Sequence, residues 1–200
     1  MKILGLTGSV GMGKSTAAAM LRRMGVTVYD ADAAVHRMMR KGGIAVAAIA
    51  AAFPGVERDG AIDRTELGKR VFGNDAAMKR LEAIVHPLVR QDEDRFLNRM
   101  RRRRTKLVVM DVPLLFESGR QKRYDATMVV TAPEFLQHAR VLARPGITPE
   151  RLAAIKARQM PDTEKRKRAD FIVPSGLGRA PTWRCLAAVL RRVAQRRHAP

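Results

Sequence analysis

The chain has 200 residues, which is the length of one α/β domain with insertions and enough to bury a core without a disulfide or a structural metal. The single cysteine, Cys185, has no second cysteine to pair with, which excludes an internal disulfide and indicates a reducing compartment. The apolar run before Gly5 is too short for a signal peptide, and no stretch approaches the ~20 apolar residues of a membrane-spanning helix. We therefore expect a cytoplasmic protein that does not enter a membrane.

The formal net charge of +20 permits a nucleic acid, an anionic membrane surface or a polyanionic small substrate as partner. Aromatic residues make up only 4% of the chain, so a platform for stacking single-stranded bases is poorly supplied. We expect the basic runs to be solvated helix faces or chain tail, namely Arg101–Arg104, Lys165–Arg168 and Arg191–Arg197. A polyanionic small substrate accounts for the charge at least as well as nucleic acid, which is the less favoured partner.

The first half of the chain alternates strand and helix and then becomes helical. Residues 3–6 predict a strand, residues 15–24 a helix, and residues 26–29 a second strand. Asp63, followed three positions later by a glutamate, is a capping-box signal for a helix start. We interpret residues 33–104 as a helical insertion in the sheet. Its predicted helices cover residues 33–40, 44–53, 63–72, 75–85 and 87–104.

The sheet pattern resumes after the insertion. Residues 107–110 are apolar throughout, which is typical of a parallel strand buried on both faces, and Asp111 stands at the carboxyl end of that strand. Alternating strands and helices imply a right-handed parallel sheet with its ligands at the carboxyl ends of the strands. The predicted fold class is therefore α/β, with three layers around a parallel sheet. The remaining predicted elements are a strand at 125–131, a helix at 134–143, a polar hinge at 144–146, a helix at 149–159, a strand at 171–173 and a helix at 183–197.

A phosphate-binding loop lies between the first strand and the first helix. The spacing Gly8-x4-Gly13-Lys14-Ser15 satisfies the P-loop pattern in full. Glycines let the backbone N–H groups fold inward around a phosphate, Lys14 supplies charge to the β- and γ-phosphates, and the Ser15 hydroxyl is suited to Mg²⁺. The helix that begins there adds the positive end of its dipole. The sequence thus predicts nucleoside triphosphate binding by Gly8, Gly11, Met12, Gly13, Lys14, Ser15 and Thr16, with Lys14 also catalytic.

Three aspartates end predicted strands at the edge that holds this loop. Asp30 and Asp32 close the second strand, where a carboxylate can orient an attacking hydroxyl and accept its proton. Asp32 leads directly into a helix, so a role as helix N-cap is an equal alternative. Asp111 stands where P-loop proteins keep the carboxylate that steadies Mg²⁺ or its water; a cap of the following turn is the other interpretation.

Two other sets of side chains could carry chemistry. Arg140 and Arg144 lie four positions apart on a predicted helix and would share a face. Arginines there suit a mobile lid that closes over transferring phosphates, although a solvated helix face would look much the same. His86 precedes Pro87, which takes a favoured first position of a predicted helix. A lone histidine in that place is more often a packing or capping residue than a catalytic one.

These features together resemble the dephospho-coenzyme A kinase family, over essentially the whole chain and in the same order. An aspartate pair after the second strand also occurs in shikimate kinases, so it is weakly specific. The Pro-Leu-Leu-Phe-Glu and His-Pro sites are much more specific. The runs that carry the resemblance are Gly5–Gly8, Val28–Asp32, Phe72–Arg90, Asp111–Glu117 and Gln159–Pro161 with Lys165, Ala169 and Asp170 after it.

The resemblance implies ATP-dependent phosphorylation of the ribose 3′-hydroxyl of dephospho-coenzyme A, the last step of coenzyme A synthesis. Mg²⁺ is the implied cofactor, both substrates are polyanions, and a monomer is favoured. By the same resemblance Asp32 is the base, Arg140 is a catalytic lid residue and Arg144 binds ATP. The residues implied to bind the acceptor are Asp30, Asp32, His86, Pro113, Leu114 and Glu117.

The resemblance also implies three parts within one P-loop kinase domain. The core would comprise residues 1–32, 105–138 and 168–200, the acceptor-binding insertion residues 33–104, and a short lid residues 139–167 or thereabouts. One stretch departs from the family pattern. Residues 172–176 lack the usual Asp-Asn pair of a loop expected near the adenine of ATP, which leaves base selectivity in question.

Overall fold

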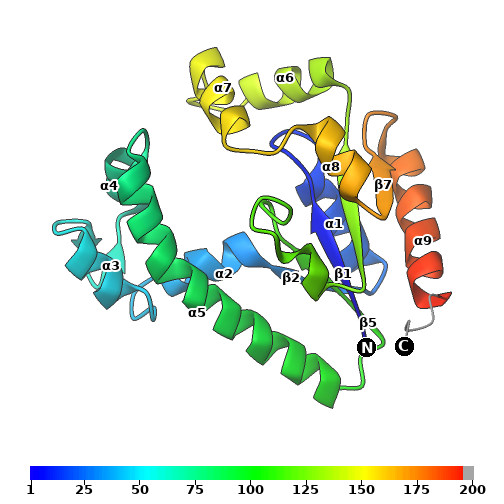
Figure 1. Cartoon of the computed structure of the whole chain (residues 1–200), viewed down its shortest axis with the longest axis horizontal. Helices are drawn as coiled ribbons and strands as arrows, with labels where there is room; N and C mark the ends of the chain where they lie inside the picture. Colours follow the sequence, from blue (N-terminus) through cyan, green and yellow to red (C-terminus); the bar gives the residue numbers. More distant parts are fainter. Residues whose placement is uncertain (196–200) are drawn as a thin grey trace. The chain divides into compact units, whose positions relative to one another are not determined.

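The computed structural model describes residues 1–195, and the chain divides into two compact units (Figure 1). The first unit comprises Met1–Tyr29 and the chain from Arg104 onward, and the second comprises Asp30–Arg103. Among the described residues, no helix is long and apolar enough to cross a membrane.

A five-stranded sheet forms the centre of the first unit, in the order β2-β5-β1-β6-β7. β1 pairs in parallel with β5 and β6, and β6 pairs in parallel with β7, so the carboxyl ends of these four strands lie at one edge. The predicted α/β class with a parallel sheet is confirmed. The strands are β1 (Lys2–Thr7), β2 (Thr27–Asp30), β5 (Leu107–Asp111), β6 (Ala126–Thr131) and β7 (Phe171–Pro174).

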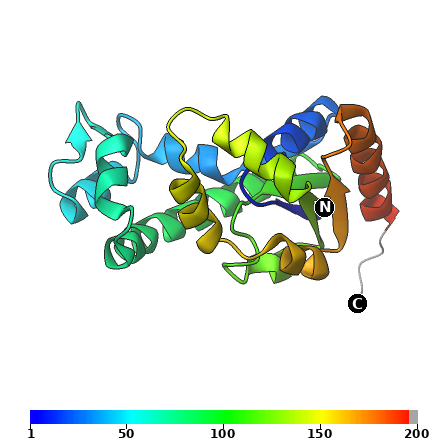
Figure 2. The same cartoon turned by 90° about the horizontal axis from the view of Figure 1, so that it is seen from above.

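Two helices cover one face of this sheet. α1 (Lys14–Arg23) and α9 (Arg179–Gln195) pack on each other, as the view in Figure 2 also shows. α9 begins before its predicted start at Trp183, and Arg196 and Arg197 of the predicted helix lie outside the described residues. The side chains between these helices and the sheet form the main core of the unit, including Leu4, Leu6, Leu21, Met128, Val130, Val173, Leu186, Val189 and Val193.

The opposite face of the sheet is covered by the segment after β5, which contains a short 3₁₀ helix (Arg120–Arg123), and by α8 (Asp162–Arg168). Side chains alternate along a strand, so Gly5 faces away from its core neighbours Leu4 and Leu6. A Cβ on Gly5 would lie only 2.6 Å from Cδ1 of Leu115, so glycine permits this close packing.

Lys165 corrects the prediction that residues 165–168 form a solvated helix face. Its side chain is fully buried, and its Nζ lies 2.9 Å from Oε1 of Glu117. The other members of the run, residues 166–168, are exposed. The prediction failed because one position of α8 faces the sheet, and a lysine can occupy such a position when a carboxylate neutralises it.

α6 (Glu134–Leu142) and α7 (Pro149–Ala157) follow β6 and pack on each other. Nζ of Lys156 on α7 lies 2.6 Å from Oε1 of Glu134 on α6, and its hydrogen bond lowers the pKa of that carboxyl. The Thr148 side chain caps α7 by accepting from the Arg151 N–H, with Pro149 at the first helical position. The cap therefore stabilises the start of α7, and the ion pair joins α7 to α6.

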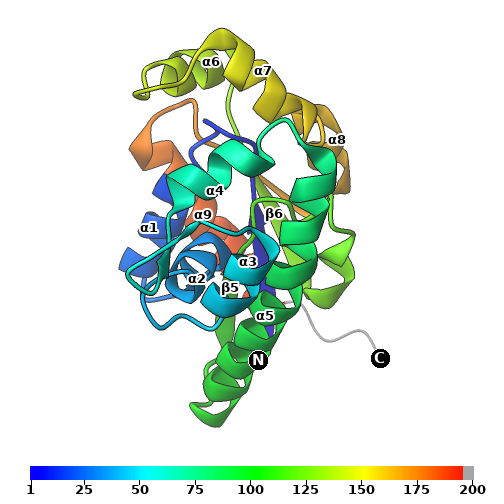
Figure 3. The same cartoon turned by 90° about the vertical axis from the view of Figure 1, so that its left-hand side faces the viewer.

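The second unit is mainly helical (Figure 3). It also contains a two-stranded hairpin that the sequence pattern did not predict, closed by Asp59 and Gly60 at positive φ angles of 51° and 78°. Asp-Gly is a preferred pair for such a turn because both positions need left-handed backbone. The elements are α2 (Ala31–Met38), α3 (Val46–Ala52), β3 (Glu57–Arg58), β4 (Ala61–Ile62), α4 (Arg64–Val71) and α5 (Asp75–Arg102).

α5 corrects a second prediction. Residues 75–85 and 87–104 were expected to form two helices, with Pro87 beginning the second, but one helix runs through Pro87. Proline removes one hydrogen bond and crowds the carbonyl four residues earlier, a local cost of about 3 kcal/mol. That cost is offset because the apolar stripe of α5 packs on α2, α3 and α4. The buried apolar residues of the stripe are Val85, Val89, Phe96, Leu97 and Met100.

The interior position of Pro87 generates a stability prediction. Pro87 is exposed, so Pro87→Ala removes little packing while restoring a backbone N–H and relieving the crowded carbonyl. We expect the free energy of unfolding to rise by ~1–3 kcal/mol and the Tm to rise with it. Thermal and urea denaturation of the two proteins measure this, and an unchanged or lower Tm would contradict it.

Candidate active site

The phosphate loop connects the end of β1 to the start of α1. Gly11 and Gly13 have φ angles of +76° and +88°, in the left-handed region that favours glycine. Gly8 is constrained differently, because a Cβ there would lie 2.8 Å from the carbonyl oxygen of Val130 on β6. The loop therefore needs its glycines both for backbone conformation and for close packing.

Two glutamines hold the loop at Val10. Nε2 of Gln137 on α6 donates to the Val10 carbonyl at 2.8 Å, and the Val10 N–H donates to Oε1 of Gln159 at 3.1 Å. Sequence reasoning did not identify Gln137 at all, and Gln159 entered only through the family resemblance. No local pattern could have found them, because each lies more than a hundred residues away along the chain.

Lys14 and Asp111 meet beside the loop. Nζ of Lys14 lies 2.7 Å from Oδ1 of Asp111, and the Asp111 side chain is only 4% exposed. β1 and β5 are neighbours in register, with Leu6 opposite Asp111, so the end of β5 comes next to the loop. The pairing places a buried negative charge where it orients the lysine of the loop.

The residues present fit a magnesium ion that is carried by ATP. Among residues 1–195, no cluster of three or more His, Cys, Asp or Glu side chains could enclose a metal by itself. Nucleotide-bound Mg²⁺ needs no such cluster, because phosphate oxygens and waters supply most of its ligands. Ser15, exposed in the first turn of α1, and Asp111, at the end of β5, are the oxygen donors of the type that Mg²⁺ takes from P-loop proteins. Thr16 follows Ser15 in the same exposed turn.

Arg140, in the last turn of α6, lies against the loop. Its guanidinium donates to Oγ and to the carbonyl of Ser175, both at 3.1 Å, and to the Gly11 carbonyl at 3.4 Å. The Ser175 hydroxyl in turn donates to the Met12 carbonyl at 2.7 Å. Ser175 was not predicted as a site residue, yet it links Arg140 to the loop.

Arg144 does not share a helical face with Arg140. α6 ends at Leu142, and Arg144 lies in the exposed turn beyond it. The helix ends early because the chain turns towards Pro145, and the residue before a proline is disfavoured in helical conformation. The two arginines therefore belong to different local structures.

The segment after β5 contacts both the sheet and the region after α7. The Thr7 hydroxyl donates to the Pro113 carbonyl at 2.9 Å. Oε1 of Glu117 accepts from the Met160 N–H at 2.8 Å and lies 2.9 Å from Nζ of Lys165. Leu114 is exposed.

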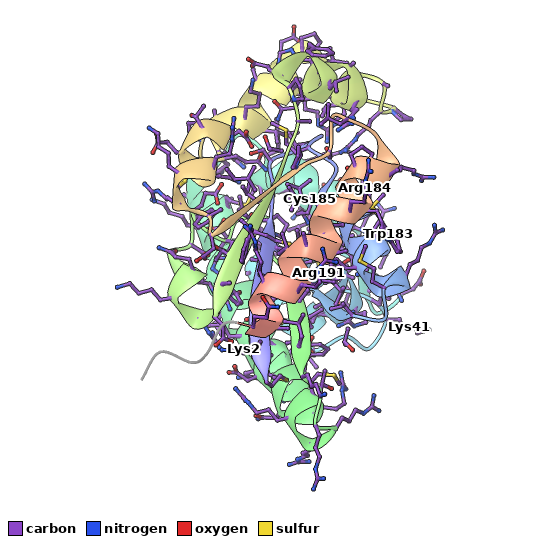
Figure 4. All side chains as sticks on the ribbon, turned by 90° about the vertical axis from the view of Figure 1, so that its right-hand side faces the viewer. Lys2, Lys41, Trp183, Arg184, Cys185 and Arg191 are labelled. Atoms are coloured by element: carbon purple, nitrogen blue, oxygen red, sulfur yellow. The ribbon has the colours of Figure 1, made fainter. Side chains whose placement is uncertain are left out.

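Two hollows flank the phosphate loop within the first unit. One, of about 920 Å³, includes Ser9 and Met12 and extends along α6 to the region after α7. The other, of about 530 Å³, includes Ser15 and Thr16 and extends along α1 to Trp183, which Figure 4 labels on α9. The loop thus has open space on both sides for a bound molecule.

Asp30, Asp32 and His86 belong to the second unit. Asp30 is the N-cap of α2, and its side chain accepts from the Ala33 N–H at 2.9 Å. Asp32 lies in the first turn of α2, so the alternative that Asp32 caps this helix is wrong. The helix begins at Ala31, which gives the capping position to the preceding aspartate. His86 lies in the middle of α5 and is exposed, which corrects its predicted place at a helix start.

The comparisons with known proteins agree with this arrangement. The family model for dephospho-CoA kinase matches residues 2–177. Dephospho-CoA kinase of Paramagnetospirillum magneticum is 69% identical over 166 residues, which cover 83% of this chain and 78% of that protein.

Two solved structures are similar over nearly the whole chain. The crystal structure of TT1252 from Thermus thermophilus has a TM-score of 0.83 and 38% identity, covering 96% of this chain and 97% of that one. Dephospho-CoA kinase from Campylobacter jejuni has a TM-score of 0.71 and 26% identity, covering 98% of each. A glycine loop held beside a lysine–aspartate pair on a parallel sheet, together with these matches, shows that the chain belongs to the dephospho-CoA kinase family.

Proposed function

We propose that this protein transfers the γ-phosphoryl group of ATP to the ribose 3′-hydroxyl of dephospho-coenzyme A, giving ADP and coenzyme A. The observation that carries the proposal is the loop of residues 8–15, with Lys14 paired to Asp111 and Arg140 seated against it, in a chain of the dephospho-CoA kinase family. The loop supports a triphosphate donor, and the family supports the acceptor.

On the donor side, the loop amides and the start of α1 would surround the β- and γ-phosphates. Lys14, which Asp111 holds in place, would place its charge on these phosphates, and Arg140 would stabilise charge that develops on the transferred group. Mg²⁺, held by Ser15 and through water by Asp111, would neutralise phosphate charge when bound. Arg144, in the turn after α6, would contact the phosphates from a lid around residues 139–167.

On the acceptor side, Asp32 would accept the proton of the attacking hydroxyl, and Asp30 would hold the start of α2 so that Asp32 is correctly oriented. His86 would contact the acceptor from α5, with the second unit as the acceptor-binding insertion. Pro113, Leu114 and Glu117 would form the wall of the site after β5. The formal net charge of +20 favours both substrates, because each is a polyanion.

The reaction is tested by incubating the protein with ATP, Mg²⁺ and dephospho-coenzyme A. We expect ADP and coenzyme A to form in equal amounts, measured by chromatography of both products. A panel of nucleosides and shikimate in place of dephospho-coenzyme A separates this activity from other small-molecule kinases. ADP release no faster than in the acceptor-free control would remove the proposal.

The role of Lys14 predicts a large activity loss on substitution. Lys14→Ala removes the positive charge that would contact the β- and γ-phosphates. We therefore expect kcat/KM for ATP to fall by ~10²-fold or more. Lys167→Ala is the matched control, because its side chain is 73% exposed on α8, and it should react like the parent. Parent-like kinetics for Lys14→Ala would contradict the role.

The role of Asp32 predicts a different kinetic signature. Asp32→Asn should leave ATP binding nearly unchanged and lower turnover by ~10²-fold or more, because the positioned base is lost. Asp59→Asn is the control in the same unit, since asparagine tolerates the positive φ of that turn as well as aspartate does. If Asp32→Asn turns over at the parent rate, Asp32 is not the base.

A further inference from the structure

We propose that Lys165 and Glu117 are positioning residues for the phosphate loop, acting through the segment of residues 159–162, here called the anchor segment. The inference rests on the proposed kinase function only in that the loop binds ATP. It assigns a role to an ion pair that does not contact the phosphate loop itself.

The lysine of the pair lies in the interior, and the Glu117 side chain is 17% exposed. Lys165 is 0% exposed, and its Nζ lies 2.9 Å from Oε1 of Glu117, which comes from the segment after β5. Fully buried lysines are rare, and a buried ion pair seldom adds stability over apolar side chains of similar volume. The pair instead sets the position of α8 relative to the segment after β5, because it joins the two at one carboxylate oxygen.

That same atom also holds the anchor segment. Oε1 of Glu117 accepts the N–H of Met160 at 2.8 Å, so one carboxylate oxygen takes a backbone hydrogen bond and also forms the ion pair with Lys165. The second oxygen, Oε2, is buried and has no hydrogen-bond partner among the described residues. Glu117 is therefore directed towards Lys165 and Met160, and it supports the wall of the site from behind.

The anchor segment in turn holds the phosphate loop. Gln159, next to Met160, accepts the Val10 N–H at 3.1 Å. Asp162, at the other end of the segment, accepts from the Thr131 hydroxyl of β6 at 2.6 Å. A shift of Met160 would therefore move Gln159 relative to Val10, and the loop would lose one of its two holds at that residue.

The charge on Lys165 matters because of Glu117. Without the ammonium group, the mostly covered Glu117 carboxylate would keep the Met160 N–H as its donor among the described residues. Such a carboxylate would draw in water or move towards solvent, and the Met160 contact would be displaced with it. The predicted consequence is a loosened loop in a protein that still folds.

The test is the kinetics and nucleotide affinity of Lys165→Met, with Lys167→Met on the same helix as the exposed control. We expect kcat/KM for ATP to fall by ~10- to 100-fold, with a raised KM for ATP, because a misplaced loop binds the phosphates poorly. The KM for dephospho-coenzyme A should rise less than the KM for ATP, because Glu117 is one of several residues proposed to border the acceptor. Simple loss of folded enzyme would lower the maximal rate and leave both KM values unchanged.

Calorimetric titration with ATP and Mg²⁺ gives the same answer without any acceptor. A raised Kd for ATP in Lys165→Met supports the positioning role even if the acceptor were a different alcohol. A parent-like Kd overturns it, whatever the acceptor assay shows. The two readouts thus separate failure of this inference from failure of the proposed reaction.

Two further variants test the path through the anchor segment. Gln159→Leu removes only the Val10 contact and should raise the Kd for ATP as Lys165→Met does, and combining the two should have less than the summed effect in free energy. Glu117→Gln with Lys165→Met removes both charges while keeping an oxygen for the Met160 N–H, and it should recover most of the affinity. Additive effects, or no recovery in the double variant, would contradict the proposal. If Lys165→Met does not fold, Gln159→Leu decides the matter alone, and a parent-like Kd in that variant overturns the inference.

Discussion

A phosphate loop built largely from small residues cannot hold its own shape, and the surrounding structure supplies the groups that do. Gly11 and Gly13 adopt left-handed backbone and have no side chains with which to anchor themselves. Hydrogen bonds from residues outside the loop hold it in place. Gln137 donates to the Val10 carbonyl, Gln159 accepts from the Val10 N–H, and Ser175 donates to the Met12 carbonyl. These contacts come from α6, from the region after α7 and from the segment after β7. The sheet edge and three distant parts of the chain thus converge on one short loop.

The distribution of charge follows from a shortage of acidic groups. The chain has 39 lysines and arginines against 19 aspartates and glutamates. Among the acidic groups of the first unit that pair with lysines are Asp111, beside Lys14, and Glu117, beside Lys165. The first pair holds a lysine next to the loop that is proposed to bind phosphate, and the second holds a lysine away from solvent. Lysine therefore lies in one place within the phosphate loop and in another serves as an internal ion-pair partner.

The stretch that departs from the family pattern is hydrogen-bonded to the phosphate loop and to Arg140. Residues 172–176 lack the usual Asp-Asn pair, but Ser175 in this stretch accepts from Arg140 and donates to Met12. Its N–H also donates to the Thr131 carbonyl at 2.8 Å, which continues the pairing of β7 with β6. The departure thus changes the side chains of this segment while the segment stays tied to the phosphate loop and to Arg140.

Local chemistry determined what the sequence by itself could predict. Unbroken apolar runs specified buried parallel strands, Asp63 specified the start of α4, and the glycine spacing specified the loop, because each signal acts within a few residues. Tertiary structure decided the rest. α5 passes through Pro87 because packing on three helices outweighs a local cost, Lys165 is buried because a carboxylate from a distant segment meets it, and Gln137 reaches Val10 only once β6 has paired with β1. In each case the deciding partner is far away along the chain, so no local pattern carries it.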